Sequence, residues 1–187
     1  MKIADYLELM HTFEKLKNEQ RHSWTSSGRR ESVAEHSWRL ALMAMLIAPE
    51  FPEADMNRVI RMCLIHDLGE AFTGDIPTFD KTSADTERED DLFAGWVNTM
   101  PQENREEWKA LLAEMNAQHT LEARIYKALD KMEAVIQHNE SDIATWLPLE
   151  YDLQLHYGKE NVQFSPWFRE LKAEIDNWSR KKIAENT

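Results

Sequence analysis

The sequence predicts an all-α protein, and three observations support that class. Apolar residues recur at helical spacing in several long stretches. Only five glycines and six prolines interrupt the 187 residues. No stretch alternates cleanly between polar and apolar residues, as a half-buried strand does, so no strand is expected. A chain of this length forms one domain with a substantial core, and residues 1–187 are interpreted as a single domain.

The N-terminal part is predicted to be a helix followed by a polar loop. The helix covers residues 3–18, where Leu7, Met10 and Phe13 follow helical spacing. Residues 17–30 are mostly polar and contain serines and a glycine, which is typical of a loop.

Two further helices are expected in the next forty residues. One begins at Ser32 and runs to about residue 48, and Ser32 with Glu35 has the spacing of a capping box. The other begins after Asp55 and is expected over residues 56–72. Both contain large apolar residues, so both are predicted to face the core.

The remainder of the chain is predicted to be helical after one loop at residues 73–82. The expected helices cover residues 84–99, 101–118 and 120–140, with Pro101 and Thr120 at their starts, and two more open near Pro148 and Pro166. The metal-binding core is placed at about residues 30–140, and residues 141–187 are interpreted as a C-terminal helical extension.

Charge and cysteine content limit the classes of partner. The formal net charge of −12 makes nucleic acids and anionic membranes poor partners. The single cysteine, Cys63, stands in an apolar run and is interpreted as a small core residue in a protein of the reducing cytoplasm. The N-terminus does not resemble a signal peptide, and no apolar run reaches membrane length.

Four chemically related side chains occur in separate helical stretches. They are His36, the adjacent pair His66 and Asp67, and Asp130. Two imidazoles and two carboxylates form a mixed nitrogen and oxygen ligand set for a divalent cation such as Mn, Fe, Co, Ni or Zn. Their joint presence therefore predicts a metal site.

Each of these residues also has an ordinary interpretation. His36 alone would more often be a hydrogen-bonded core residue than a ligand. A carboxylate in a helix as apolar as that of Asp130 needs a cation, and Lys127 or Lys131 would supply one in a salt bridge. It is the combination of the four that favours a metal site.

The segment after the His-Asp pair adds further polar groups. Glu70 lies four residues after His66 and therefore near the same helical face. Asp75 follows Gly74 in the loop, where it is either a hydrogen-bond acceptor for a sugar hydroxyl or a turn residue. Arg21 offers a planar fork that matches phosphate, although a surface arginine would be ordinary there.

Three segments resemble the HD-domain phosphohydrolases, and more closely their branch of 5′-deoxynucleotidases. The segments are Glu31-Ser-Val-Ala-Glu-His36, His66-Asp-Leu-Gly-Glu70 continuing into Thr73-Gly-Asp75-Ile-Pro77-Thr78, and Asp130-Lys-Met-Glu133. The similarity spans about residues 5–140. It implies a helical HD domain that removes phosphate from deoxyribonucleoside 5′-monophosphates.

The resemblance also implies roles for individual residues. One divalent metal ion, among Co, Mn, Ni, Zn, Fe and Mg, would be held by His36, His66, Asp67 and Asp130. The catalytic residues would be Glu70, which handles the attacking water, and Asp75. The substrate would contact Arg21, Asp75, Ile76, Pro77 and Thr78.

The other histidines and the tryptophans are assigned to packing or to the surface. Some family members have tryptophan directly after the arginine, whereas this chain has His22 and places Trp24 two positions later. Only His119 lies between Asp67 and Asp130, where two-metal members generally have two extra histidines, so a single metal is expected. The remaining histidines, interpreted as surface or packing residues, are His11, His22, His138 and His156. The tryptophans are interpreted as core or dimer contacts.

The predicted function is metal-dependent hydrolysis of nucleoside 5′-monophosphates, with deoxyribose preferred, by a cytoplasmic homodimer. One alternative is another phosphoester: a nucleoside triphosphate, a cyclic nucleotide or an alarmone. A second alternative is a regulatory protein that retains the metal for folding. Glu70 and Asp75 argue against that alternative, because a purely structural metal site needs neither.

Overall fold

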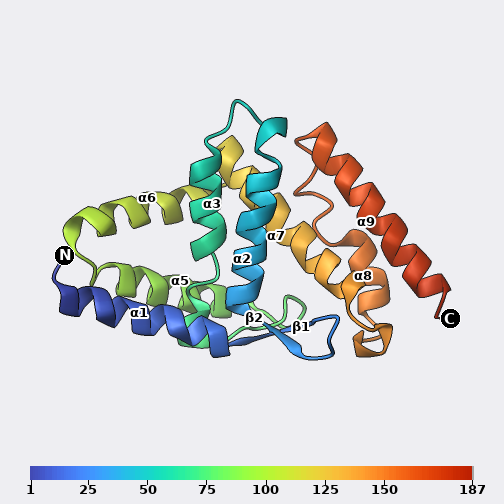
Figure 1. The fold of residues 1–187 in the computed structure, drawn as a ribbon, viewed down its shortest axis with the longest axis horizontal. Helices are drawn as coiled ribbons and strands as arrows, with labels where there is room; N and C mark the ends of the chain where they lie inside the picture. The colour runs from blue at the N-terminus through green and yellow to red at the C-terminus, as the bar shows by residue number, and fades with distance from the viewer. Residues whose placement is uncertain (187) are drawn as a thin grey trace.

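The computed structural model describes residues 1–186 and shows a helical protein with one small hairpin (Figure 1). This architecture confirms the all-α class. The helices are α1 (Ile3–Asn18), α2 (Val33–Leu46), α3 (Met56–Ile65), α4 (Glu70–Thr73), α5 (Ser83–Val97), α6 (Gln102–Ala117), α7 (Leu121–Glu140), α8 (Glu150–His156) and α9 (Pro166–Ala184). Single 3-10 turns cover Ala48–Glu50 and Ile143–Thr145.

The expectation that the chain contains no strand was wrong. Strands β1 (Gln20–Trp24) and β2 (Arg30–Ser32) pair antiparallel within the segment predicted as a polar loop. One contact with the rest of the fold and one between its own strands stabilise this polar hairpin. The Gln137 side-chain amide of α7 donates to the Trp24 carbonyl over 2.7 Å, and within the hairpin the Arg30 guanidinium lies 4.6 Å from the centroid of the Trp24 ring. Such side-chain contacts leave no periodic signal in a short strand.

The single helix predicted over residues 56–72 is interrupted. Helix α3 ends at Ile65, a tight turn follows, and α4 begins at Glu70. Gly69 stands in this turn close to α5, where an added Cβ would lie 2.6 Å from Cγ of Glu89. The turn departs from the helical progression of about 100° per residue, so it frees adjacent side chains to face one site.

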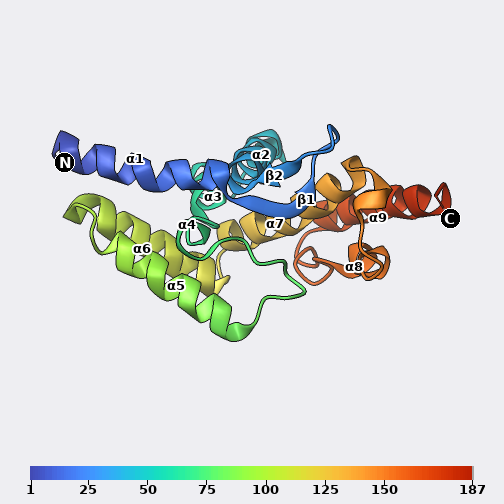
Figure 2. The ribbon, with the colours of Figure 1, turned by 90° about the horizontal axis from the view of Figure 1, so that it is seen from below.

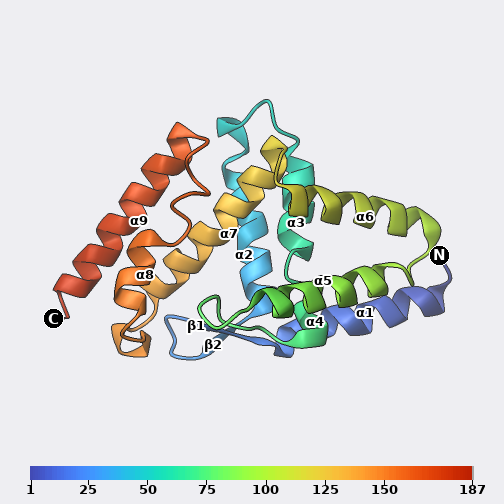
Figure 3. The same cartoon turned by 180° about the vertical axis from the view of Figure 1, so that it is seen from behind.

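Helices α2, α3 and α7 pack together around the centre of the molecule, with α7 crossing behind α2 (Figures 1 and 3). The fully buried residues of this core include Leu40, Met62, Cys63, Ile125 and Leu129. Cys63 is thus a core residue, as predicted.

The predicted starts of α2 and α7 are confirmed. Ser32 and Glu35 form the capping box, and the Thr120 side chain accepts a hydrogen bond from the Ala123 amide. Each cap satisfies amide groups that have no partner inside the helix.

The other helices lie at opposite ends of this core. Helices α1, α5 and α6 extend to one side, and α8 and α9 lie on the other (Figure 2). Aromatic contacts among Phe13, Trp96 and Trp108 join α1, α5 and α6. Helix α9 packs against α7, which ties the predicted C-terminal extension to the core. Within residues 1–186, no helix combines the length and the apolar character needed to cross a membrane.

Candidate active site

The four side chains predicted as metal ligands lie together. The Nε2 atoms of His36 and His66 are 3.2 Å apart. Asp67 Oδ2 lies 3.1 Å from His66 Nε2, and Asp130 Oδ1 lies 3.4 Å from His36 Nε2. The residues come from α2, the turn after α3, and α7, so the packing of the central helices brings them to one point. Their role as ligands stays a prediction, but their convergence is a property of the fold.

Hydrogen bonds orient both imidazole rings. His36 Nδ1 donates to the buried Glu133 carboxylate, and His66 Nδ1 donates to the Cys63 carbonyl over 2.9 Å. Each neutral ring then carries its proton on Nδ1 and presents a lone pair at Nε2. Two lone pairs facing each other repel unless a positive charge lies between them. The donor set therefore fits a divalent cation.

The electrostatics of the cluster also favour a positive charge at this point. Burial and Arg21 act to lower the pKa of His36, but Glu133 and Asp130 outweigh them and raise it to about 10. Burial would likewise raise the pKa of Asp67, yet His66 and His36 hold it well below its usual range. The carboxylates are thus ionised and stabilise a positive charge on or between the two rings.

Asp130 has both of the environments considered for it. Its Oδ1 faces the two histidines, while its Oδ2 is paired with Lys127 Nζ at 2.9 Å and Lys131 Nζ at 3.4 Å. The salt-bridge interpretation and the ligand interpretation are therefore compatible, because each uses a different oxygen. The two lysines balance the charge of a carboxylate that is only 7% exposed.

Arg21 comes from β1 and reaches the same cluster. Its Nη1 lies 3.1 Å from Asp67 Oδ2, and its Nε lies 3.2 Å from Oε2 of Glu31, which is buried. Burial, with Glu133 next, raises the pKa of Glu31 to about 7. The hairpin that sequence reasoning missed is thus the element that positions Arg21.

Glu70 is a buried carboxyl group without a full set of partners. It is 5% exposed, and its Oε2 has no hydrogen-bond partner. Burial, and then the charges of Asp67 and Asp75, raise the pKa of Glu70 well above its usual value. An ionised carboxylate held in such a place is a strong proton acceptor.

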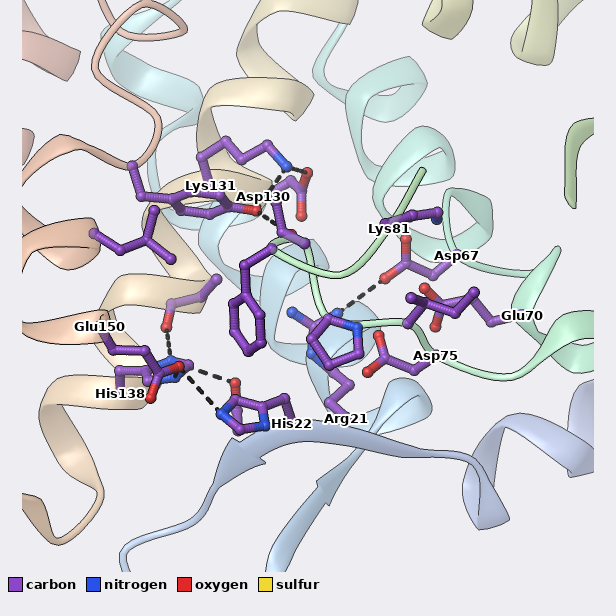
Figure 4. Close-up of a pocket in the computed structure, with 18 of the residues that line it drawn as sticks. Arg21, His22, Asp67, Glu70, Asp75, Lys81, Asp130, Lys131, His138 and Glu150 are labelled. Carbon is purple, nitrogen blue, oxygen red and sulfur yellow. Dashed lines mark hydrogen bonds and ion pairs between the residues drawn. The ribbon is translucent and has the colours of Figure 1, made fainter. Parts of the chain in front are cut away.

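Arg21, Asp67, Glu70 and Asp130 line a cavity of about 430 Å³, which has the size of a small-molecule site (Figure 4). The predicted substrate residues on its wall are Arg21, Asp75, Ile76, Pro77 and Thr78. Gly74, with φ of 80°, turns the loop into the cavity, and its Cβ would lie 3.3 Å from Oε1 of Glu19. The Thr78 hydroxyl lies 3.0 Å from the Tyr157 hydroxyl of the C-terminal segment.

Sequence reasoning gave no role to several residues of this site. They are Glu31, Lys81, Glu133, Glu150 and Tyr157. Glu133 had a usable signal, because it lies three residues after Asp130 and so near the same face of α7. His22 and His138, assigned to the surface or to packing, also line the cavity.

The fold and the site define a helical HD domain with its His, His-Asp and Asp groups assembled at one point. A sequence model of the HD domain matches residues 13–172, and the chain belongs to this family. The match extends beyond residue 140, so it includes much of the segment predicted as an extension.

Within that family the chain is similar to proteins named 5′-deoxynucleotidase HDDC2. The protein of Dictyostelium discoideum is 29% identical over 97% of this chain and 96% of its own length. The protein of Xenopus laevis is 31% identical over 96% of this chain and 90% of its own length. Among solved structures, a predicted metal-dependent phosphohydrolase from Magnetospirillum magnetotacticum aligns with a TM-score of 0.81 and 29% identity, covering 98% of this chain and 94% of the other.

Proposed function

We propose that this protein is a metal-dependent phosphohydrolase that removes phosphate from nucleoside 5′-monophosphates, with deoxyribose preferred. The observation that carries the proposal is the 3.2 Å approach of the Nε2 atoms of His36 and His66, beside two carboxylates, Asp67 and Asp130, that line a nucleotide-sized cavity. The names of the relatives support the same activity.

One divalent ion would be held by His36, His66, Asp67 and Asp130. When bound, such an ion supplies Lewis-acid chemistry, which polarises a phosphoryl oxygen and acidifies water. The protein keeps the rings oriented through Glu133 and the Cys63 carbonyl, so the site is organised before any ion enters.

The side chains around the site match the needs of a phosphate monoester. Its dianion repels a nucleophile, so cationic groups must offset that charge. Arg21, Lys127 and Lys131 line the cavity next to the acidic cluster and offer these charges. Glu70 accepts the proton of the attacking water, because it is buried and its Oε2 has no protein partner.

The loop after α4 is proposed to hold the sugar. Asp75 lines the cavity, and its backbone amide donates to Oε1 of Glu19 over 3.3 Å, which fixes its position. Its carboxylate would accept a hydrogen bond from the 3′-hydroxyl, with Thr78 beside it. A pocket with no room for a 2′-hydroxyl would disfavour ribonucleotides by about 10–200-fold in kcat/KM. A homodimer and a cytoplasmic location stay predictions from the sequence.

The test is phosphate release from 5′- and 3′-mononucleotides, in ribo and deoxyribo forms, with Mn²⁺ or Co²⁺ supplied. The proposal expects turnover of 5′-deoxynucleotides and little of the 3′-isomers. Equal rates on 3′- and 5′-monophosphates would contradict the nucleotidase assignment and leave a general phosphatase. Equal rates on ribo- and deoxyribonucleotides would contradict the sugar preference alone.

Two aspartates of the same loop provide a matched pair of variants. Asp75→Asn should raise KM and lower kcat/KM for deoxynucleotides, because the carboxylate that faces the sugar is lost. Asp80→Asn changes an exposed residue five positions later and should leave kcat/KM unchanged. Equal behaviour of the two variants would remove Asp75 from the substrate site.

A further inference from the structure

A second group of metal-ligating side chains lies on the wall of the same cavity. His22 from β1, His138 from α7 and Glu150 from α8 converge there (Figure 4). Glu150 Oε1 lies 2.9 Å from His138 Nε2 and 3.2 Å from His22 Nε2. The three donor atoms all lie within 4.8 Å of one another. Donor atoms bonded at about 2.0–2.1 Å to one tetrahedral ion are about 3.3 Å apart, so the spacing fits a shared ion.

The contacts of His138 allow its Nε2 atom to ligate an ion. Its Nδ1 lies 3.1 Å from the Ala134 carbonyl, which only accepts, and 3.4 Å from the Ser23 hydroxyl. The shorter contact places the proton of a neutral ring on Nδ1. Nε2 lies 2.9 Å from Glu150 Oε1, and either a proton or a metal ion completes that contact. This is the arrangement of a ligating histidine whose other nitrogen is held by a backbone carbonyl.

The carboxylate of Glu150 is fixed and almost fully buried. It is 1% exposed, and its Oε2 accepts a hydrogen bond from the Leu147 amide over 2.7 Å. Only Oε1 therefore remains to face the two rings. Trp146 packs edge-on against His138 and donates to the His138 carbonyl, which holds the ring in place.

His22 supplies a second, independent observation in favour of a ligand at this point. Its Nε2 is buried and makes no hydrogen bond, although Glu150 Oε1 is 3.2 Å away. Two ligands of one ion lie at such a distance without a hydrogen bond between them. On the other side of the ring, Arg30 Nη1 donates to the His22 carbonyl and lies 3.4 Å from Nδ1. That second contact is long for a hydrogen bond, so it holds the proton on Nε2 only weakly.

We propose that His22, His138 and Glu150 form a second metal site, for a borderline divalent cation such as Zn²⁺ or Co²⁺. Two imidazoles and one carboxylate are a ligand set such ions accept. Because all three residues line the cavity, the remaining coordination positions face the bound substrate or water. His138 lies eight residues after Asp130, about 12 Å along α7, so the two ions would bind at separate ends of one cavity.

The experiment is a titration of the chelator-treated full-length protein with Co²⁺. Binding is monitored by calorimetry and by the visible absorption of the bound ion. Wild type should bind one additional ion per protein with high affinity compared with His138→Gln. Glu150→Gln should lack the same ion. Glu150→Gln keeps an oxygen that accepts from Leu147, and thermal unfolding measured by circular dichroism shows that each variant is folded. His156→Gln, which changes a histidine of α8 whose side chain is 62% exposed, is the matched control and should bind as wild type does.

The same titration in a His36→Ala/Asp67→Ala background separates this site from the one proposed for catalysis. One ion should still bind there, and adding His138→Gln should weaken its binding by at least about 100-fold. Binding that is identical with and without His138, in both backgrounds, would overturn the proposal. It would show that a proton alone joins the histidines to Glu150, whatever the outcome of the phosphate-release assay.

Discussion

At the scale of single residues, Glu133 shows how a buried carboxylate acts through its neighbour. It is fully buried on α7 and accepts a hydrogen bond from His36 Nδ1, while His36 Nε2 faces His66 and Asp130. The residue does not line the cavity, so the role we propose for it is to orient the His36 ring.

The first prediction follows from that contact. Glu133→Gln keeps the shape of the side chain but removes the charge that fixes the His36 proton on Nδ1. The affinity for Mn²⁺ or Co²⁺, measured by calorimetry, should fall by about 10–100-fold. Glu140→Gln, two turns later on α7 where Glu140 pairs with Arg39, should leave the affinity unchanged. Unaltered binding in Glu133→Gln would show that the His36 ring needs no such support.

The second prediction concerns Glu70. Because its free Oε2 is assigned to the attacking water, Glu70→Gln should bind metal normally while kcat falls by about 10²–10⁴-fold. Metal content by elemental analysis and single-turnover phosphate release measure the two effects separately. Loss of metal together with activity would make Glu70 a ligand and would refute the assignment.

At the scale of secondary-structure elements, helix positions could be predicted from sequence, and the interruptions could not. The starts at Ser32 and Thr120 follow from local capping chemistry, which a sequence displays directly. The hairpin over residues 20–32 depends on Gln137, a residue more than a hundred positions away. The turn after α3 also depends on a residue distant in sequence, because Gly69 lies close to Glu89 of α5.

The residues of the candidate site could also be predicted only in part. The four candidate ligands could be chosen because each is chemically unusual in an apolar helix. His22 and His138 could not be chosen in this way. They form a cluster only with Glu150, which approaches them when α8 folds back beside α7.

The third prediction tests the start of α2. Arg29 contributes most to lowering the pKa of Glu35 to about 2, and Ser32 adds to it while burial opposes it. A lowered folded-state pKa stabilises the protein above the unfolded value of about 4.3 and loses that effect as pH falls toward 2. The free energy of unfolding of wild type should therefore exceed that of Glu35→Gln at pH 6, and the difference should shrink by pH 2.5. The pair is exposed, so the charge term should be below about 1 kcal/mol. If the difference in free energy of unfolding does not change with pH, the charge of Glu35 contributes nothing, and only the uncharged hydrogen bonds of the cap stabilise the helix.

At the scale of the whole molecule, the C-terminal segment completes the cavity that the central helices begin. The Tyr157 hydroxyl accepts from Lys131 of α7 over 2.9 Å and contacts Thr78 of the loop. Gly158, with φ of 72°, lets the chain turn directly against α7. The segment after residue 140 thus contributes to the site and is not a separate appendage.

The fourth prediction compares two glycines. A Cβ at Gly158 would lie 2.6 Å from Lys131 Cβ, and its positive φ is unfavourable for other residues, so Gly158→Ala should lower the free energy of unfolding by at least about 1 kcal/mol. A Cβ at Gly95, inside α5, meets nothing within 4 Å, so Gly95→Ala should stabilise the protein by about 0.5–1 kcal/mol. Urea denaturation measures both. Equal changes in the two variants would contradict the close packing of α8 and its following turn on α7.

Whether the His36 cluster is a catalytic metal site is decided by the rate of phosphate release from a deoxyribonucleoside 5′-monophosphate, measured on chelator-treated protein before and after Mn²⁺ or Co²⁺ is added. The ligand set of His36, His66, Asp67 and Asp130 predicts no turnover without the ion and restored turnover with it, and predicts that Asp67→Ala cannot be restored. Turnover that is unchanged by removing the ion, or that survives in Asp67→Ala, would contradict the claim that this cluster is a catalytic metal site.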